Sequence, residues 1–248
     1  MEAGTVDWSS FGTRADGAAA PEAEGLRERK KRLLRQQLSD TATEMFLAEG
    51  FDAVRVSAIA AACGVSEKTV FNYFPTKESL ILDRFETLPE EVAAALSTPG
   101  TPLVEAVLGV LNRELRALTG WMAAQPDYGE AVRQIARFGA LLGSTPSLRA
   151  HQREAADRLT AEAARVLSAL AGPAGHAVEA QVAAHALVGL WPAQYAALRR
   201  HLMSARSGEE LFGLVSAEVR RAARVVDQGL GSWMPVTRPG AHGPSLSP

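Results

Sequence analysis

Residues 54–82 read VRVSAIAAACGVSEKTVFNYFPTKESLIL, a pattern that predicts two short helices joined by a tight turn. The first helix, over residues 56–63, is rich in small apolar residues. It must end at Gly64, because glycine reaches the left-handed conformation that reverses the chain. Ser66 is a good N-cap, so a second helix is expected to begin at Glu67. This spacing is typical of a helix-turn-helix, whose second helix enters the major groove of DNA.

The second helix is expected to have an apolar side and a polar side. Val70, Phe71 and Phe74 are predicted to pack inward. The outward side carries side chains that can form hydrogen bonds: Lys68, Thr69, Asn72 and Tyr73. Such positions meet base edges when a helix enters a major groove. Pro75 ends this helix, and Lys77 then lies at the start of the next one, where the positive end of a helix can hold a phosphate.

The sequence resembles the TetR (tetracycline-repressor) family in two motifs, the Ile-Ala-x-x-x-Gly-Val-Ser core of residues 59–66 and the Phe-Pro-Thr-Lys-Glu segment of residues 74–78. The resemblance covers residues 27–82, about a fifth of the chain. It implies an all-α protein in which a three-helix DNA-binding domain precedes a helical domain for ligand binding and dimerisation. It also implies transcriptional repression that a small molecule relieves.

The resemblance assigns DNA binding to seven residues: Arg55, Ser66, Lys68, Thr69, Asn72, Tyr73 and Lys77. Lys68 and Thr69 would read bases, Asn72 would contact a base or a phosphate, and Tyr73 and Lys77 would hold phosphates.

Two positions depart from the family pattern. Val54 and Arg55 stand where threonines commonly open the first helix of the motif, so Arg55 would contact a phosphate electrostatically instead. Phe71 stands where the recognition helix commonly carries an exposed tyrosine, and one backbone hydrogen bond is expected to be lost with the hydroxyl.

Although the net charge of the chain is −2, basic residues are concentrated just before the helix-turn-helix. This basic arm consists of Arg27, Arg29, Lys30, Lys31 and Arg32, with Arg35 following, and only Glu28 opposes it. One interpretation is a solvated helix face. The interpretation that we favour is an arm that approaches phosphates or the minor groove.

Composition indicates a globular protein. A chain of 248 residues with 47% hydrophobic content can bury a substantial core in one or two domains. Cys63 is the single cysteine, which excludes an intramolecular disulfide, and it is expected to be a small packing residue. The chain lacks an apolar run long enough to span a bilayer and a signal-peptide core, so the expected compartment is the cytoplasm.

Helical periodicity continues along the rest of the chain, and no strand pattern competes with it. About nine helices are expected, over residues 29–49, 56–63, 67–73, 76–97, 102–124, 127–142, 146–171, 175–204 and 207–228. The predicted divisions are a disordered tail at 1–25, the DNA-binding domain at 26–82, the effector-binding and dimerisation domain at 83–228, and a flexible tail at 229–248.

By resemblance, the helices at 175–204 and 207–228 would pair with their copies in a homodimer and set the spacing of a near-palindromic operator. The last helix has an apolar stripe at Leu211, Val215, Val219, Ala222 and Val226. The alternative is that both helices bury their stripes within one subunit.

The effector is expected to be a small molecule that is apolar or aromatic, held by apolar walls with a few polar anchors. The candidate residues are Trp121, Tyr128, Arg137, Gln181, His185, Trp191 and Tyr195. The alternative for the aromatic residues is core or interface packing, and for Arg137 a solvated or salt-bridged face.

Two other classes of protein are alternatives to a ligand-regulated repressor. A helical-bundle enzyme is disfavoured because no histidine follows a glutamate at i, i+3 and neither His-Glu-x-x-His nor Gly-x-Ser-x-Gly occurs. We therefore expect no catalytic residues, no metal site and no cofactor. A DNA-binding protein without an effector would instead bind many sequences in a salt-sensitive manner.

Overall fold

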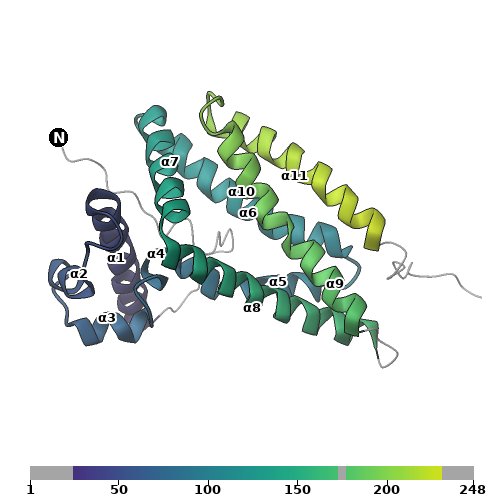
Figure 1. The fold of residues 1–248 in the computed structure, drawn as a ribbon, viewed down its shortest axis with the longest axis horizontal. Coiled ribbons are helices and arrows are strands. Elements are labelled where there is room, and N and C mark those ends of the chain that lie inside the picture. Colours follow the sequence, from purple (N-terminus) through teal and green to yellow (C-terminus); the bar gives the residue numbers. More distant parts are fainter. Residues whose placement is uncertain (1–24, 173–176, 231–248) are drawn as a thin grey trace, which may run out of the picture.

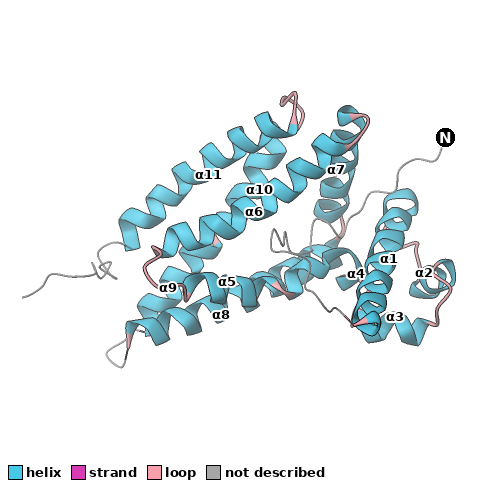
Figure 2. Cartoon of the chain, turned by 180° about the vertical axis from the view of Figure 1, so that it is seen from behind, coloured by secondary structure: helices cyan, strands magenta, loops and turns pink. Residues whose placement is uncertain are grey.

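A computed structural model describes residues 25–172 and 177–230. Throughout these ranges the chain forms helices and loops without a strand, which confirms the predicted all-α class (Figures 1 and 2). The elements are α1 (Leu26–Glu49), α2 (Val56–Ala62), α3 (Glu67–Tyr73), α4 (Ser79–Leu82), the 3₁₀ turn η2 (Asp83–Glu86), α5 (Leu88–Leu96), α6 (Leu103–Ala124), α7 (Tyr128–Ser144), α8 (Pro146–Ala171), α9 (Ala177–Val188), α10 (Leu190–His201) and α11 (Gly208–Leu230). Nearly all of the two predicted tails lies outside the described residues.

Two glycines end helices as predicted. Gly50 has a φ of 89° and Gly64 a φ of 68°, conformations that favour glycine over other residues. After Gly50 the chain turns back, so that the Phe51 ring lies 4.8 Å from the Phe46 ring, centroid to centroid. These two reversals fold α2 and α3 against α1.

The first hydrophobic cluster joins α1 to α4 into a head. Its fully buried side chains include Leu38, Phe46, Ile59, Val70 and Phe74. Leu148 of α8 also belongs to this cluster and has no exposed surface. The start of α8 is therefore packed into the core of the head, although about 65 residues of chain separate Leu148 from α4.

The second hydrophobic cluster is formed by α5 to α11. Helix α8 packs on α5 and α9, and α11 packs on α6 and α10 (Figure 1). Val107, Leu111, Leu167, Leu187 and Leu211 are among its fully or almost fully buried members. This bundle lies beside the head, and η2 connects the two along the chain.

The structure divides two segments that the sequence predicts as helices with an interruption near Pro89 and a kink at Pro192. Residues 76–97 form α4, η2 and α5, because Pro89 in the first turn of α5 cannot donate the backbone hydrogen bond that would continue the preceding helix. Residues 177–201 form α9 and α10, which are separated at Gly189 because Pro192 offers no N–H to the carbonyl of Val188. The described residues therefore contain eleven α-helices, where nine were expected.

Candidate DNA-binding surface and effector site

Helix α3 is anchored by its apolar side and exposes its polar side. Val70 and Phe74 have no exposed surface, whereas Lys68 and Asn72 are exposed and Tyr73 is half-buried. The expectation that Phe71 packs inward is wrong, since 45% of its side chain is exposed. It lies next to the exposed polar residues of the helix, which places an aromatic ring on the same surface.

The start of α3 is fixed by the cap that the sequence predicts. The Ser66 hydroxyl accepts a hydrogen bond from the Thr69 backbone N–H at 3.1 Å, and the two hydroxyl oxygens lie 2.8 Å apart. The cap satisfies a backbone donor and also restricts the Thr69 side chain. Both residues are therefore ordered before any DNA is bound.

Arg55 and the basic arm are exposed on the head. Arg55 is the N-cap of α2 and its side chain forms no capping hydrogen bond, in agreement with the missing family threonines. Arg27, Arg29, Lys30, Lys31 and Arg32 are exposed in the first turns of α1. Because α1 begins at Leu26, these cations lie on a helix and not on an extended segment that precedes it.

Lys77 is engaged within the head. Its ammonium donates to the Phe51 carbonyl and lies 4.4 Å from the centroid of the Phe51 ring and 5.5 Å from that of the Phe46 ring. A cation over an aromatic face is stabilised by the ring quadrupole. The structure thus gives Lys77 a packing role that competes with the predicted phosphate contact.

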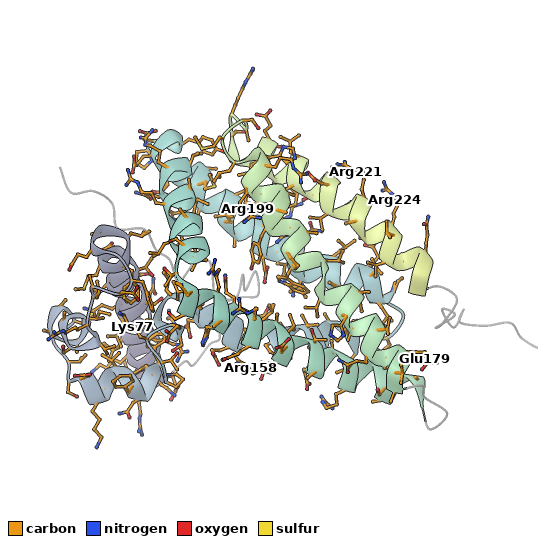
Figure 3. All side chains as sticks on the ribbon, viewed as in Figure 1. Lys77, Arg158, Glu179, Arg199, Arg221 and Arg224 are labelled. Atoms are coloured by element: carbon orange, nitrogen blue, oxygen red, sulfur yellow. The ribbon has the colours of Figure 1, made fainter. Side chains whose placement is uncertain are left out.

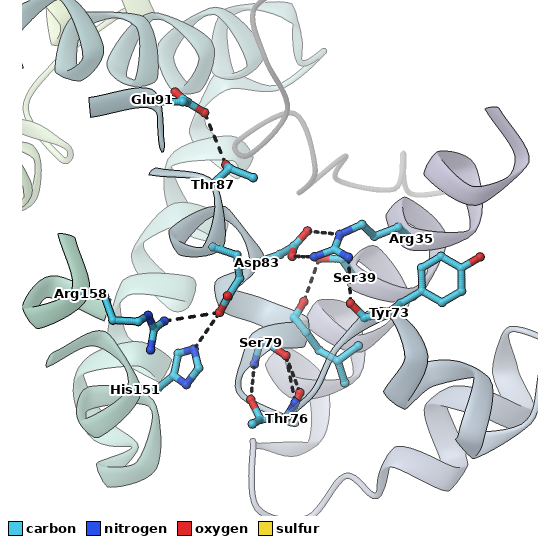
Figure 4. Close-up of polar contacts among 12 residues, drawn as sticks. Arg35, Ser39, Tyr73, Thr76, Ser79, Asp83, Thr87, Glu91, His151 and Arg158 are labelled. Carbon is cyan, nitrogen blue, oxygen red and sulfur yellow. Dashed lines mark hydrogen bonds and ion pairs between the residues drawn. The ribbon is translucent and has the colours of Figure 1, made fainter. Parts of the chain in front are cut away.

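Arg35 of α1 contacts both α3 and η2, a role that the sequence pattern did not reveal (Figure 4). Its guanidinium binds both carboxylate oxygens of Asp83 in η2, with Nε donating to Oδ2 at 2.8 Å. A further nitrogen, Nη1, donates to the Tyr73 carbonyl at 2.8 Å. Arg35 therefore differs from the basic arm that precedes it in the sequence, because its charge is paired within the fold. Charge alone does not reveal which cations have such partners.

Trp191, one of the effector candidates, forms a buried polar contact in the bundle. The Trp191 indole N–H of α10 donates to Oε2 of Glu114 in α6 at 3.2 Å, and Trp191 is only 4% exposed. Sequence reasoning missed Glu114, because a single glutamate on an amphipathic helix gives no signal of its orientation. Trp121 and Tyr195 are half-buried and pack against the same hydrophobic cluster.

Tyr128, the first residue of α7, carries a buried hydroxyl without a hydrogen-bond partner. Burial raises the pKa of this phenol above its usual value of 10, and the negative charge of Glu210 raises it further. The half-buried Tyr128 side chain packs against the second hydrophobic cluster. A neutral polar group beside apolar surface is the kind of anchor that a ligand pocket contains.

The remaining effector candidates face solvent. Gln181 and His185 are exposed and lie one turn apart, with His185 Nδ1 2.8 Å from the Gln181 carbonyl oxygen. Arg137 is exposed, 3.8 Å from the Glu130 carboxylate. The buried side of α9 is formed instead by Ala180, Ala183, Ala184 and Leu187. The structure therefore does not bring Gln181, His185 and Arg137 together with Trp191.

The described residues contain no group of three or more His, Cys, Asp or Glu side chains placed to hold a metal ion. Among the described helices, none combines the length and the apolar character needed to cross a membrane.

Residues 38–83 match a family described as "Bacterial regulatory proteins, tetR family", in the segment that forms most of the head. Over 154 residues the chain is 30% identical to the HTH-type transcriptional regulator TcmR of Streptomyces glaucescens, an alignment that covers 62% of this chain and 67% of that protein. The chain belongs to the TetR family. It is a DNA-binding transcriptional regulator and not an enzyme, which sets aside the helical-bundle enzyme considered above.

Two further TetR-family proteins illustrate the similarity. The HTH-type transcriptional repressor KstR of Mycolicibacterium smegmatis is 30% identical over 100 residues, which cover 38% of this chain and 47% of that protein. The repressor QsdR of R. erythropolis has a solved structure that matches with a TM-score of 0.41 and 20% identity over 85% of this chain and 99% of that one.

TetR-family regulators bind DNA and small molecules and act as dimers. In this chain the predicted apolar stripe of α11 packs within the subunit, because Leu211, Val215 and Val219 are buried against the chain's own helices. Other large apolar side chains of α9, of α11 and of the turn after α10 are exposed: Val178, Val182, Met203, Leu214 and Val225.

Proposed function

We propose that this protein is a repressor that binds a near-palindromic operator as a homodimer and leaves it when a small molecule binds the bundle. The observation that carries the proposal is α3, a capped helix with two fully buried anchors and an exposed polar side. A helix held in this manner presents side chains to a major groove with little loss of conformational entropy.

Three residues of α3 are proposed to read bases. Lys68 and Asn72 are exposed, and Thr69 is restricted by the cap. A lysine suits guanine acceptors, an asparagine suits adenine, and a threonine methyl suits thymine. Arg55, Tyr73 and the basic arm are proposed to bind phosphates, which position the head without selecting sequence.

The dimer is proposed to form through α9 and α11, which pack on each other within the subunit. Val178 and Val182 are 74% and 63% exposed on α9, and Leu214 and Val225 are 38% and 71% exposed on α11. In each helix the two side chains are separated by whole turns, so they share a face. Two copies of such a surface can pack through a twofold axis.

The effector is proposed to be an aromatic or apolar molecule that binds among α6, α7 and α10. Trp121, Trp191 and Tyr195 supply apolar surface, and the Tyr128 hydroxyl and the Glu114 carboxylate supply polar groups. These groups favour a ligand with a hydrogen-bond acceptor for Tyr128 and a donor for Glu114. Gln181, His185 and Arg137 are less suited, because their side chains are exposed.

The test is selection of bound duplexes from a random pool by the purified protein, followed by competition with candidate aromatic metabolites. Repression by this mechanism predicts enrichment of one near-palindromic sequence and its release by a metabolite that also raises the melting temperature. Salt-sensitive binding to all duplexes without enrichment would contradict operator reading and indicate a DNA-binding protein without an effector.

A further inference from the structure

Arg35 is half-buried on α1 and contacts two segments that follow it by about 40 and 50 residues. Its guanidinium forms a two-point ion pair with Asp83 and donates to the Tyr73 carbonyl, and its carbon Cζ lies 4.6 Å from the centroid of the Phe74 ring. A planar guanidinium has a fixed fork of donors, so these contacts define its position more closely than a single ion pair would.

The contact of Arg35 with the Tyr73 carbonyl affects the recognition helix, because Tyr73 is the last residue of α3. The final carbonyls of a helix lack intrahelical partners, and a cation is favourable at this negative end. Arg35 therefore holds the end of the recognition helix opposite to the Ser66 cap. The two contacts fix α3 at both ends within the head.

Asp83 is the first residue of η2, the turn through which the chain leaves the head. One turn after Arg35, the Ser39 hydroxyl donates to the Leu80 carbonyl at 2.8 Å, so α1 also holds α4 (Figure 4). The same arginine thus contacts the end of the recognition helix and the start of the connection to the bundle. No sequence-specific contact with DNA is needed for this role.

We propose that Arg35 is a positioning residue for operator recognition: it sets the angle of α3 relative to η2 and thereby the distance between the two recognition helices of a dimer. The inference rests on the proposed function, since it requires a dimer that reads two half-sites. Arg35 acts through Tyr73 and Asp83 and does not itself touch DNA.

Spacing is the property that this contact would control. Two recognition helices read half-sites separated by about one helical turn of DNA, roughly 34 to 36 Å, or by an equivalent distance on a deformed duplex. A head that pivots on its connection presents α3 at a range of distances. Loss of Arg35 should therefore relax the preferred number of base pairs between half-sites while leaving the preferred bases unchanged.

A second ion pair of η2 leads to the bundle. Glu86, at the end of η2, lies 3.5 Å from a guanidinium nitrogen of Arg158 and 3.8 Å from Nε2 of His151, both on α8, and Figure 4 draws these two contacts as dashed lines. Figure 3 labels Arg158 on α8. Because this pair also holds the connection, the matched control lies farther along α8, where Nε of Arg165 donates to Oε2 of Glu162 at 2.9 Å and a second guanidinium nitrogen donates to the other carboxylate oxygen. Arg165→Gln removes this two-point pair without altering the ties of Arg35 to α3 and η2.

The experiment uses the full-length protein and a set of duplexes that share the selected half-sites and differ by single base pairs in their separation. The wild type should prefer one separation, and Arg35→Gln should weaken binding to that duplex about tenfold while weakening binding to neighbouring separations much less. Asp83→Asn, which keeps the Tyr73 contact, should give a smaller relaxation. Arg165→Gln should keep the wild-type spacing profile.

Arg35→Lys serves as the conservative variant, because it keeps the charge near Asp83 and loses the fork. Its spacing profile should lie between those of the wild type and Arg35→Gln. If folded Arg35→Gln and Arg35→Lys weaken binding equally at every separation, the positioning role is excluded. If Arg35→Gln does not fold, a wild-type spacing profile in both Asp83→Asn and Arg35→Lys also excludes the positioning role. A wild type that binds no duplex at all would instead defeat the proposed function.

Discussion

Lys68 lies in the first turn of α3 with its side chain exposed, beside the capped Thr69. If it contacts a base, Lys68→Ala should cost about 1–3 kcal/mol of operator binding and relax the preference at one base pair. Binding titrations against the selected operator and its single-base variants measure both effects. An equal loss on every duplex would assign Lys68 to a phosphate.

Lys77 shows how the fold changes the meaning of a basic residue. Its ammonium is occupied by the Phe51 carbonyl and two aromatic rings. Lys77→Met should keep the aliphatic packing, lose the cation, and lower the free energy of unfolding by about 1–2 kcal/mol. Chemical denaturation measures this loss, and the salt dependence of operator binding should be unchanged. A salt slope reduced by about one would restore Lys77 as a phosphate contact.

At the scale of elements, the junction of α11 and α6 depends on a glycine. A Cβ added to Gly208 would lie 2.3 Å from the Thr119 carbonyl oxygen of α6, and backbone cannot move aside easily. Gly208→Ala should therefore separate the two helices and lower the free energy of unfolding by about 1–3 kcal/mol.

Gly213→Ala on the same helix is the control, because a Cβ there meets nothing within 4 Å. That change should stabilise the protein by about 0.8–1.0 kcal/mol through helix propensity. Urea unfolding of both variants at one protein concentration makes the comparison. Equal stabilities would show that α11 does not pack against Thr119 as closely as described.

Sequence alone predicted those elements whose signals are local. Gly50, Gly64 and Ser66 mark helix ends through backbone conformation and capping, and the structure agrees at each. Periodicity located the remaining helices, and the prolines signalled the breaks near Pro89 and Pro192, but the apolar pattern alone is continuous and does not show where each helix ends.

Contacts between distant segments were beyond sequence reasoning. The effector candidates Gln181 and His185 lie one turn apart on α9, yet the buried arc of this helix lies roughly a quarter turn away from them. Alanine forms most of that arc, so hydropathy did not distinguish it from the neighbouring face. Glu114 and Arg35 gain their roles only from partners 77 and 48 residues away.

At the scale of the whole molecule, the head and the bundle are joined by packing as well as by the chain. Leu148 of α8 is buried in the core of the head, with Phe138, Leu141 and Leu142 of α7 packed beside it. At the end of η2, Glu86 forms an ion pair with Arg158 of α8. A displacement of α7 or α8 by a ligand would therefore act on the head directly, as the proposed release requires.

Operator reading by two heads depends on the proposed dimer surface. Val182→Glu and Val225→Glu each place a charge at a position that a twofold interface would bury in both copies. Each should convert the dimer into a monomer at micromolar concentration, and operator affinity should fall because the two half-sites are no longer bound together. Light scattering gives the mass and a binding titration gives the affinity. Leu33→Glu is the control, since Leu33 is 48% exposed on α1 and lies outside the proposed surface; it should leave the mass unchanged. If both valine variants stay dimeric, the subunits meet through another face.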